Sequence, residues 1–538
     1  MQNLTRSQFL RGSAAIVGAS MLPSSLHAST ETRTSSLPHA AERKGKRPNV
    51  LLVIADEWRA QAFRYRGDPN APTGALDGFA LQSVDFRNAV SGTPLCCPAR
   101  ASLMTGQYPL THRVLLNDVT LKPTGPTLGE SFAGAGYRTG YIGKWHLHGS
   151  PEGHWERRLA YVPPKDRFGF MYWKAAECDH NYGHSHYYEG YDHTRKYWLG
   201  YDAIAQTEDA QLFIQANAHK GDPYFLVLSY GPPHFPYMAP TDYKVRWENQ
   251  EISLRPNVPS IERDNAVKEL RGYYAAINVL DDCFGRLMET LEATGTAEDT
   301  IVIFQADHGE MGYSQGLEYK SVPWEESIRI PFMLRYPRKY GRQGRTIDVP
   351  LAMPDIMPTL LRIAGISVPS SVEGFDWSPA LRHESAADAP RSTFLNMPVS
   401  SGDIRRDGFA EYRGVRTQRY TYVRSIKGPW LLYDNEKDPY QVRNLVATPS
   451  MKQTILGLER ELADWLHRRG DTFMPGVKYL EEDHLTHYLP ARVPIHPVSD
   501  PSNQWKSTLS EGDSDTLASY PDDMKILSET IMSQENEN

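Results

Sequence analysis

Continuous apolar runs that end in polar loops dominate the first two thirds of the chain. Four of them cover residues 49–56 ("NVLLVIAD"), 139–146, 223–234 and 300–307. A run without polar interruptions is typical of a strand that is covered on both faces. Segments with helical spacing begin at Leu76, Thr127 and Gly272, and a further one ends near Gly365. The alternation predicts an α/β fold around a mainly parallel sheet, in which ligand chemistry gathers at the carboxyl ends of the strands.

The pattern changes near residue 391. Between residues 392 and 445 aromatic and β-branched residues alternate with charged ones, which predicts a small antiparallel sheet. Residues 451–468 have the spacing of an amphipathic helix. From residue 476 the chain is polar and without pattern, and we interpret it as an extended or disordered tail. We therefore expect a large domain at 48–390, a C-terminal subdomain at 391–475 and a tail at 476–538.

The first residues have the pattern of an export signal. Arg6 and Arg11 precede or border the apolar stretch "GSAAIVGASML", which is too short to span a bilayer, and small residues follow near Ala28. We expect a signal peptide over 1–28, a linker over 29–47 and a periplasmic or secreted protein. The alternative, a buried N-terminal helix, leaves the polar run that follows unexplained. "TRSQFLRG" is similar to a twin-arginine signal with Ser7 at the second arginine, so the export route stays open.

Composition narrows the classes of function. The 538 residues are 40% hydrophobic and 23% charged, which leaves room for a large core in two or more structural units. A net charge of -7 argues against a surface for nucleic acid over the whole molecule, although a local basic pocket stays compatible with it. No segment has the roughly 20 apolar residues of a membrane span. The four cysteines are too few for a disulfide scaffold in an exported chain of this size.

The most informative segment is "PLCCPARASLMTGQYPLTHRV" at residues 94–114. Only Cys96 has a proline two residues downstream and an arginine, Arg100, four residues downstream. This arrangement resembles the signature of the sulfatases. That signature is recognised by a formylglycine-generating or sulfatase-maturing enzyme. The sequence departs from commoner versions at Ala99, where serine is frequent. The resemblance implies that Cys96 is oxidised to formylglycine. The alternative for the pair is a buried or disulfide-linked couple, and for Cys97 alone we favour a small buried apolar residue.

The resemblance covers about residues 49–470 and looks closest to bacterial sulfatases that act on polysaccharides. It implies an alkaline-phosphatase-like sandwich around the parallel sheet, with a smaller C-terminal α+β subdomain, and hydrolysis of sulfate esters. A hydrated aldehyde offers two hydroxyls on one carbon, so that one attacks sulfur and the other later expels sulfate. The substrate that this implies for an exported enzyme is a sulfated oligosaccharide or polysaccharide.

The same resemblance implies a calcium site. The metal-binding positions of the family fall on Asp56, Glu57, Cys96, Asp307 and His308. Hard carboxylate oxygens suit calcium, which takes about six to eight oxygen ligands. Asp56 and Asp307 both follow predicted strands, whereas Glu57 stands where many family members have a second aspartate.

Further positions of the family imply catalytic roles for five cationic or titratable residues. Lys144 and His146, two apart in "GKWH", lie on one side of an extended chain and are expected to contact the sulfate and assist the nucleophile. His234 is expected to donate a proton to the leaving oxygen, and Lys320 to bind the sulfate. Arg100 is expected to neutralise the nucleophile. Taken singly, each lysine could be an ordinary solvated side chain, and each histidine could have a purely structural role.

Residues 175–198 are rich in histidine, tyrosine and charge. We hypothesise that they form the leaving-group pocket, because aromatic faces and hydrogen-bond donors suit a sugar ring. The candidates are His180, Asn181, His184, His186 and Arg195. An ordinary surface loop and a second metal site stay open as alternatives. For the whole chain, the rival functions are a formylglycine-dependent phosphonate monoester or phosphodiester hydrolase and a carbohydrate-binding pseudoenzyme with an unmodified Cys96.

Overall fold

The computed structural model describes residues 47–153, 156–384, 388–400 and 409–488, which belong to one compact unit. The predicted signal peptide, most of the predicted linker and the end of the chain lie outside the described residues. Within the described part of the chain, no helix is long and apolar enough to cross a membrane.

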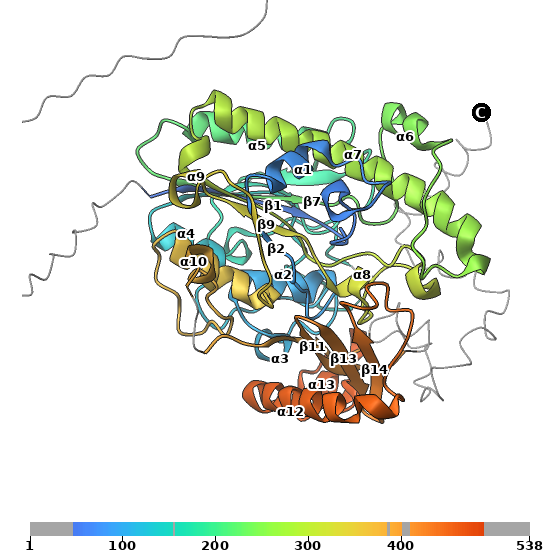
Figure 1. Cartoon of the computed structure of the whole chain (residues 1–538). Helices are drawn as coiled ribbons and strands as arrows, with labels where there is room; N and C mark the ends of the chain where they lie inside the picture. The colour runs from blue at the N-terminus through green and yellow to red at the C-terminus, as the bar shows by residue number, and fades with distance from the viewer. Residues whose placement is uncertain (1–46, 154–155, 385–387, 401–408, 489–538) are drawn as a thin grey trace, which may run out of the picture. The chain divides into compact units, whose positions relative to one another are not determined.

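A ten-stranded sheet forms the centre of the fold (Figure 1). Its strands, in spatial order, are β10 (Arg345–Ile347), β2 (Val84–Phe86), β9 (Phe332–Arg335), β8 (Thr300–Ala306), β1 (Asn49–Ala55), β7 (Tyr224–Tyr230), β3 (Arg138–Lys144), β4 (Tyr172–Ala176), β5 (His186–Glu189) and β6 (Lys196–Tyr197). The five strands from β8 to β4 run parallel, and β9, β5 and β6 pair antiparallel with their neighbours. The predicted α/β class with a mainly parallel sheet is confirmed.

Helices cover both faces of this sheet. One face carries α1 (Gly74–Ala80), α5 (Asp202–Asn217) and α7 (Arg263–Ala293), with α6 (Thr241–Trp247) against α7. The other carries α2 (Cys96–Thr105), α4 (Leu128–Gly134) and α10 (Ile356–Ile363). Short helices complete the set: α3 (Pro109–His112), α8 (Glu325–Ile328) and α9 (Pro337–Tyr340). Helix α7 begins nine residues before the predicted start at Gly272, because its first turns are rich in charge and lack an apolar stripe.

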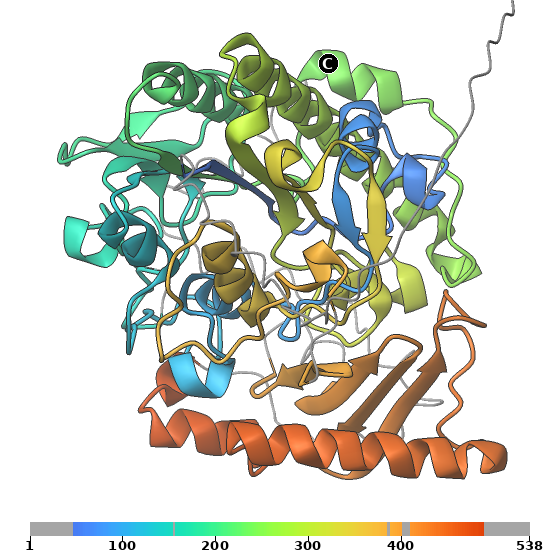
Figure 2. The same ribbon diagram turned by 60° about the vertical axis from the view of Figure 1, so that its left-hand side comes forward.

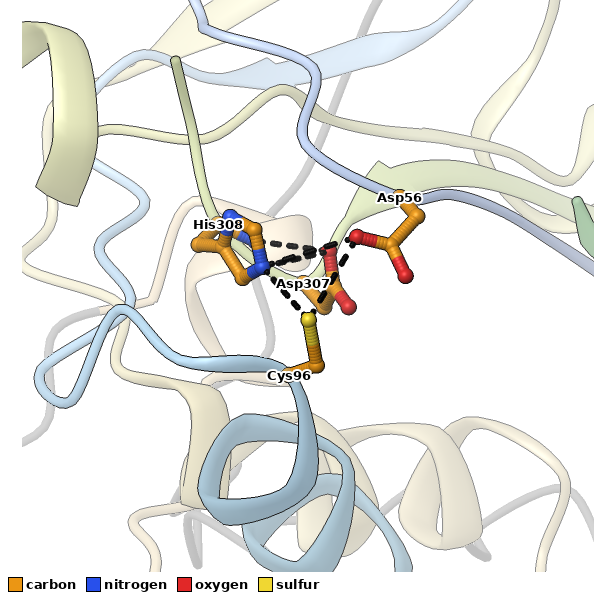
Figure 3. A group of neighbouring side chains, drawn as sticks. All are labelled: Asp56, Cys96, Asp307 and His308. Atoms are coloured by element: carbon orange, nitrogen blue, oxygen red, sulfur yellow. Dashed lines mark hydrogen bonds and ion pairs between the residues drawn. The ribbon is translucent and has the colours of Figure 1, made fainter. Parts of the chain in front are cut away.

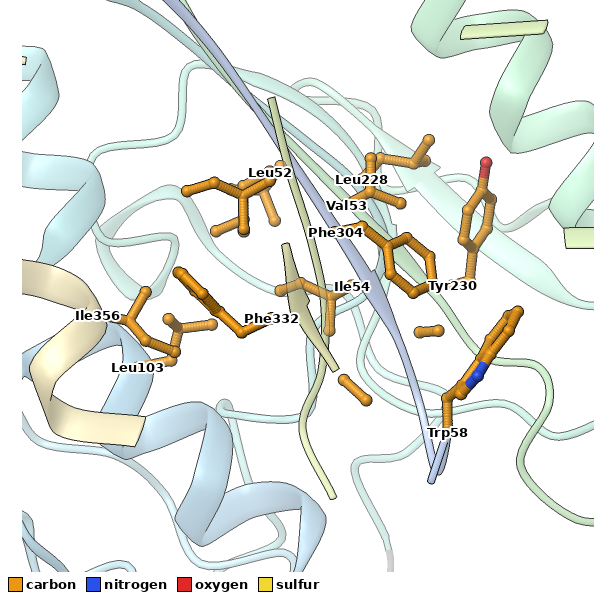
Figure 4. Packing of buried hydrophobic residues seen from close by; sticks show 14 of the residues in the cluster. Leu52, Val53, Ile54, Trp58, Leu103, Leu228, Tyr230, Phe304, Phe332 and Ile356 are labelled. Atoms are coloured by element: carbon orange, nitrogen blue, oxygen red, sulfur yellow. The ribbon is translucent and has the colours of Figure 1, made fainter. Parts of the chain in front are cut away.

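The core lies on both sides of the central strands (Figure 4). Every residue of β1 is buried, as the continuous apolar run predicts. Leu103 and Ile356 pack on the face that α2 and α10 cover, together with Phe332 of β9. Trp58 and Phe304 pack edge to face, with ring centroids 5.2 Å apart. Burying one large apolar side chain contributes about 1.5–3 kcal/mol, so this core fixes the strand ends that the site uses.

The C-terminal sheet is antiparallel and has the order β11 (Ser392–Met397), β12 (Tyr412–Thr417), β13 (Tyr420–Ser425) and β14 (Gly428–Asp434). Helix α12 (Lys452–Arg469) lies along it, as Figure 2 shows. Trp465 of α12 stacks on Phe394 of β11, with centroids 5.7 Å apart and planes at 7°. The predicted small antiparallel sheet is confirmed.

The structure differs from the predicted tail at its start. Residues 476–488 are not extended, since they form helix α13 (Gly476–Glu482) and the turn Thr486–Tyr488. Tyr479 and Leu480 are buried, and the Tyr479 hydroxyl donates to Asp471 at 2.6 Å. The few apolar residues of this polar segment are irregularly spaced and give no periodicity, which is why the pattern did not predict this helix.

Candidate active site

Three of the parallel strands bring polar residues to one edge of the sheet. Asp56 follows β1, Asp307 and His308 follow β8, and Lys144 ends β3. Cys96 is the first residue of α2, which approaches from one face of the sheet (Figure 3). A helix N-terminus favours negative charge through its unpaired N–H groups. The sheet and α2 therefore point acidic, basic and sulfur-bearing groups at one place.

Asp56, Cys96, Asp307 and His308 form one buried group whose possible ligand atoms all lie within 4.8 Å of one another. The Cys96 Sγ atom lies 3.1 Å from His308 Nε2 and 3.7 Å from Asp56 Oδ1. His308 Nε2 also lies 3.5 Å from Asp56 Oδ1. Two carboxylates, an imidazole and the Cys96 side chain thus converge on one point (Figure 3).

Arg100 and Lys144 hold the far oxygens of these carboxylates. Arg100 donates to Asp56 Oδ2 and to Asp307 Oδ2, both at 3.0 Å, and the Lys144 ammonium lies 2.6 Å from Asp56 Oδ2. All of these side chains are buried, where unpaired charges are strongly unfavourable. Because the cations use the Oδ2 atoms, the Oδ1 atoms stay directed at Cys96 and His308.

The position of Lys144 depends on the glycine before it. Gly143 has φ +98°, and a Cβ atom there would lie 2.1 Å from the carbonyl oxygen of Ser229 on β7. Only glycine permits this approach of β3 to β7. The Ser229 hydroxyl in turn accepts from Arg100 at 2.8 Å.

The site favours negative charge at the Cys96 side chain. Burial and Asp56 raise the pKa of the Cys96 thiol, but Lys144, His308 and Lys320 outweigh them and lower it to about 5. Burial likewise opposes ionisation of Asp56, and the cations led by Lys144 hold the pKa of Asp56 well below its usual range. Burial disfavours the charged form of His308, whereas Asp307 and Cys96 raise its pKa to about 10.

A second group lies beside the first and contains Glu57, His234 and Lys320. The Lys320 ammonium is 2.5 Å from His234 Nε2 and 3.1 Å from Glu57 Oε2. Burial and then Lys320 and His180 lower the pKa of His234 well below its usual range. The ring of His180 stacks on that of His234, with centroids 4.5 Å apart and planes at 8°.

The His146 imidazole is buried beside Asp118 and Cys97. Its Nε2 atom lies 3.6 Å from Asp118 Oδ1, and Asp118 also pairs with Arg158 at 2.7 Å. The backbone N–H of Asp118 donates to the Cys97 sulfur at 3.2 Å, so this group lies on the Cys97 side of the cysteine pair. Burial lowers the pKa of His146, and the neighbouring Cys178 and Cys97 outweigh burial and raise it well above its usual range.

The predicted substrate segment separates into three parts. His180 belongs to the site, and Asn181 opens a turn in which its carbonyl accepts the N–H of His184 at 2.9 Å. His184 is exposed and stacks on Tyr197, with centroids 4.4 Å apart and planes at 4°. His186 is buried and bonded to Asp179, whereas Arg195 contacts the Tyr188 hydroxyl at 3.5 Å. Strands β5 and β6 lie within this segment.

Sequence reasoning missed two buried acids next to the site. Asp118 faces His146, and Glu310 lies two residues beyond His308 in "DHGE". The Glu310 carboxylate accepts the N–H groups of Gly312 and Tyr319 at 2.7 and 3.0 Å. The nearness of Glu310 to Asp307 in the sequence was a usable signal, whereas Asp118 follows an apolar stretch and carries none.

Comparison with known protein families decides the identity. Residues 48–366, more than half of the chain, match the Sulfatase family model. The chain belongs to the sulfatase family. Residues 312–468 match a second model, described as the C-terminal part of N-sulphoglucosamine sulphohydrolase. The sequence-based recognition of a sulfatase, a sulfuric ester hydrolase, is confirmed.

Individual sulfatases are similar over most of their length. An ulvan-active sulfatase of Formosa agariphila is 38% identical over 439 residues, which are 81% of this chain and 84% of that protein. An endo-4-O-sulfatase of Bacteroides thetaiotaomicron is 31% identical over 492 residues, 81% of this chain and 94% of that protein. A solved structure from work on glycosaminoglycan metabolism by Bacteroides thetaiotaomicron superposes with a TM-score of 0.72 and 28% identity, over 82% of this chain and 100% of that one.

Proposed function

We propose that this sulfatase hydrolyses sulfate esters of a sulfated oligosaccharide or polysaccharide through a formylglycine made from Cys96, with calcium bound beside it. The observation that carries the proposal is the position of Cys96. Cys96 is the first residue of α2, and its side chain contacts the Oδ1 atom of Asp56 and the imidazole of His308 in one buried group. The Lys144 ammonium lies 4.0 Å from the Cys96 sulfur.

The residues present fit a calcium ion. Asp56 and Asp307 supply carboxylate oxygens, the ligands that calcium prefers, and His308 adds a nitrogen. Their Oδ2 atoms are bonded to Arg100, so the Oδ1 atoms are the ones placed for the ion. When bound, calcium supplies positive charge that polarises the sulfuryl oxygens and favours a deprotonated nucleophile.

The remaining side chains divide the work around the sulfate. Formylglycine, once hydrated, supplies one hydroxyl that attacks sulfur and a second that expels sulfate. Lys144 and Lys320, both buried near Cys96, bind sulfuryl oxygens and stabilise their charge in the transition state. His234 donates a proton to the leaving oxygen, and the negative charge of the bound ester raises the pKa of His234 toward the range that this requires. His146 contacts the sulfate and assists the nucleophile, as the family resemblance implies.

The entrance to the site suits a sugar. His180 and Asn181 lie next to His234, and the exposed pair His184–Tyr197 offers a flat aromatic surface further out. Phe235, 41% exposed, packs edge to face with Tyr319 on the side of Lys320. Aromatic faces with a few polar groups are typical of carbohydrate sites. The similar proteins named for ulvan and for a 4-O-sulfate agree with this substrate class.

Two measurements test the proposal. Conversion of the Cys96 thiol to an aldehyde removes about 18 mass units, which peptide mass spectrometry detects. The matured enzyme is expected to release sulfate from defined sulfated oligosaccharides and to turn over phenyl phosphonate much more slowly. Active protein with an unmodified Cys96, or a preference for the phosphonate, would overturn the proposal.

We also propose that the chain is exported after a maturing enzyme has modified Cys96. The supporting observation is the N-terminal pattern over residues 1–28. Mass spectrometry of the protein from the periplasm or the medium is expected to show a new N-terminus near Ala28. Full-length protein retained in the cytoplasm would contradict export.

A further inference from the structure

Glu57 follows Asp56 directly, yet the two carboxylates have different partners. Asp56 contacts Arg100, Lys144 and His308. Glu57 contacts Lys320 and His234. The backbone at Glu57 has φ +65°, a left-handed conformation that residues with a side chain adopt rarely. The chain thus turns sharply after β1, and one strand end serves two groups of side chains.

The Glu57 carboxylate joins two loops of the site. His234 belongs to the loop after β7, and Lys320 to the loop that precedes α8. Both side chains contact the same atom, Glu57 Oε2, at 3.1 Å, and they contact each other at 2.5 Å. Glu57 is fully buried. A buried acceptor shared by two groups fixes their relative position, because leaving either one unpaired is unfavourable.

The loop that carries Lys320 is held in place by contacts with buried acidic side chains. Tyr319 and Ser321, on either side of Lys320, both have left-handed backbones, with φ +64° and +73°. Glu310 accepts the Tyr319 N–H at 3.0 Å, and its carboxyl group lies against that of Glu57. Side chains with strained neighbours keep their place only where surrounding contacts hold them. Glu57 and Glu310 supply those contacts.

The same atoms argue against a metal ion at Glu57. Ligand atoms of Asp56, Glu57 and His234 lie within 4.8 Å of one another and could in principle form a second metal group. The Lys320 ammonium, however, contacts both Glu57 Oε2 and His234 Nε2. It occupies Glu57 Oε2, so that Oε1, which is buried without a hydrogen-bond partner among the described residues, is the oxygen left for an ion. The positive charge of Lys320 repels a divalent ion there. The cation of this group is Lys320.

We propose that Glu57 is a positioning residue for the leaving-group side of the site, where its carboxylate holds His234 and Lys320 together, and that it is not a calcium ligand. The proposal rests on the proposed function for the role of His234. Through Glu57, proton transfer to the leaving oxygen depends on the end of β1.

The test compares the Glu57→Gln variant with the wild type on two substrates. One is a sulfated sugar, and the other is the same sugar with fluorine beside the sulfated carbon, whose leaving oxygen needs less protonation. General acid catalysis contributes about 10²–10⁴-fold. We expect kcat on the plain sugar to fall about 100-fold, kcat on the fluorinated sugar to fall much less, and the calcium content of the purified protein to stay unchanged.

Three matched variants complete the experiment. His234→Ala is expected to show the same preference for the fluorinated sugar, and its combination with Glu57→Gln to add little. Glu57→Asp, which shortens the reach by one methylene, is expected to give an intermediate loss, and it replaces Glu57→Gln if that variant does not fold. Asp307→Asn is expected to lose calcium and activity on both sugars.

Loss of calcium from Glu57→Gln, or equal losses on both sugars with calcium retained, would overturn the proposal. Failure of the proposed function looks different, since the wild type itself would then leave both sugars intact. Calcium content still tests the assignment of Glu57 in that case, because it is measured without turnover.

Discussion

The two halves of the site are built in different ways. The nucleophile side consists of Asp56, Asp307, Cys96 and His308, which stand at strand ends or at the first residue of a helix. The leaving-group side consists of His234, Lys320, Glu57 and His180, which come from loops or from a left-handed turn. The first side is fixed by the sheet, whereas the second is fixed by contacts among its own members. We therefore expect changes on the nucleophile side to abolish chemistry and changes on the other to alter its selectivity.

The largest effect is expected from Cys96→Ala. Removing the proposed nucleophile should lower kcat/KM for a sulfated sugar by at least about 10⁴-fold. Folding should be preserved, because alanine fits the first position of α2. Steady-state kinetics together with a melting curve check this. Cys97→Ala is the matched control, since its buried thiol, whose pKa burial raises to about 11, takes no part in the reaction. Comparable losses in both variants would contradict the difference between the two cysteines.

Asp307→Asn should rank second. It removes the negative charge of a proposed calcium ligand, which is also one of the two buried carboxylate partners of Arg100. Loss of a residue that only hydrogen-bonds to a metal ligand lowers metal affinity about 10–100-fold, and we expect a larger loss of calcium affinity here. We also expect the free energy of unfolding to fall by about 3 kcal/mol. Calcium titrations of activity and melting curves with and without a chelator measure these effects. Asp348→Asn, at an exposed pair with Arg87, is the control, and an unchanged calcium affinity in Asp307→Asn would disprove the site.

A smaller effect is expected at the rim of the leaving-group side. His184→Ala removes one ring of the exposed pair with Tyr197, and an aromatic contact of this kind is worth about 0.5–1.5 kcal/mol. KM for a sulfated oligosaccharide should rise by up to about tenfold, with kcat nearly unchanged. His186→Ala is the comparison, because its buried ring is bonded to Asp179 and should affect stability rather than KM. If KM stays unchanged in His184→Ala, the rim does not bind the sugar.

The smallest effect on turnover is expected at Asp202, where the change concerns the pH dependence of stability. Asp202 begins α5 and accepts from Ser185 in the substrate segment, and burial raises its pKa to about 8. An acid whose folded pKa is raised keeps its proton in the folded state, so its contribution to stability is lost as pH rises from about 4 to 8. The Asp202→Asn variant has no ionisable group at this position, so its stability does not fall with pH in this way. Its stability relative to the wild type should grow by at most about 1.4 kcal/mol per pH unit over that window, as urea unfolding at several pH values would show. A difference that does not depend on pH would contradict the assignment.

The sequence was most informative where function follows from local structure. The apolar run before Asp56 and the one before Asp307 predicted two parallel strands, and parallel strands place their carboxyl ends side by side. The spacing around Cys96 singled out one of two adjacent cysteines. Strand periodicity and motif spacing depend on neighbouring residues only, so one sequence suffices for them.

The sequence was least informative about side chains whose partners come from distant segments. The substrate segment was taken as one pocket, but of its candidates His180 stacks on His234, whereas His186 turns toward Asp179. Nothing in the sequence indicated that Asp118 is the acidic neighbour of His146. These outcomes depend on the packing of β3, β5 and the loop after β7, which no local pattern encodes.

By itself, the sequence determined the α/β class, the strand ends that carry Asp56 and Asp307, and the choice of Cys96 over Cys97 by the spacing of the motif. Only the tertiary structure decided which partner each side chain takes. Asp56 and Glu57 illustrate the difference, since they are neighbours with the same charge, and a left-handed turn between them sends one to Arg100 and the other to Lys320. Local patterns indicate where strands and helices begin and end, but side-chain partners follow from the close packing of segments that are far apart in the chain.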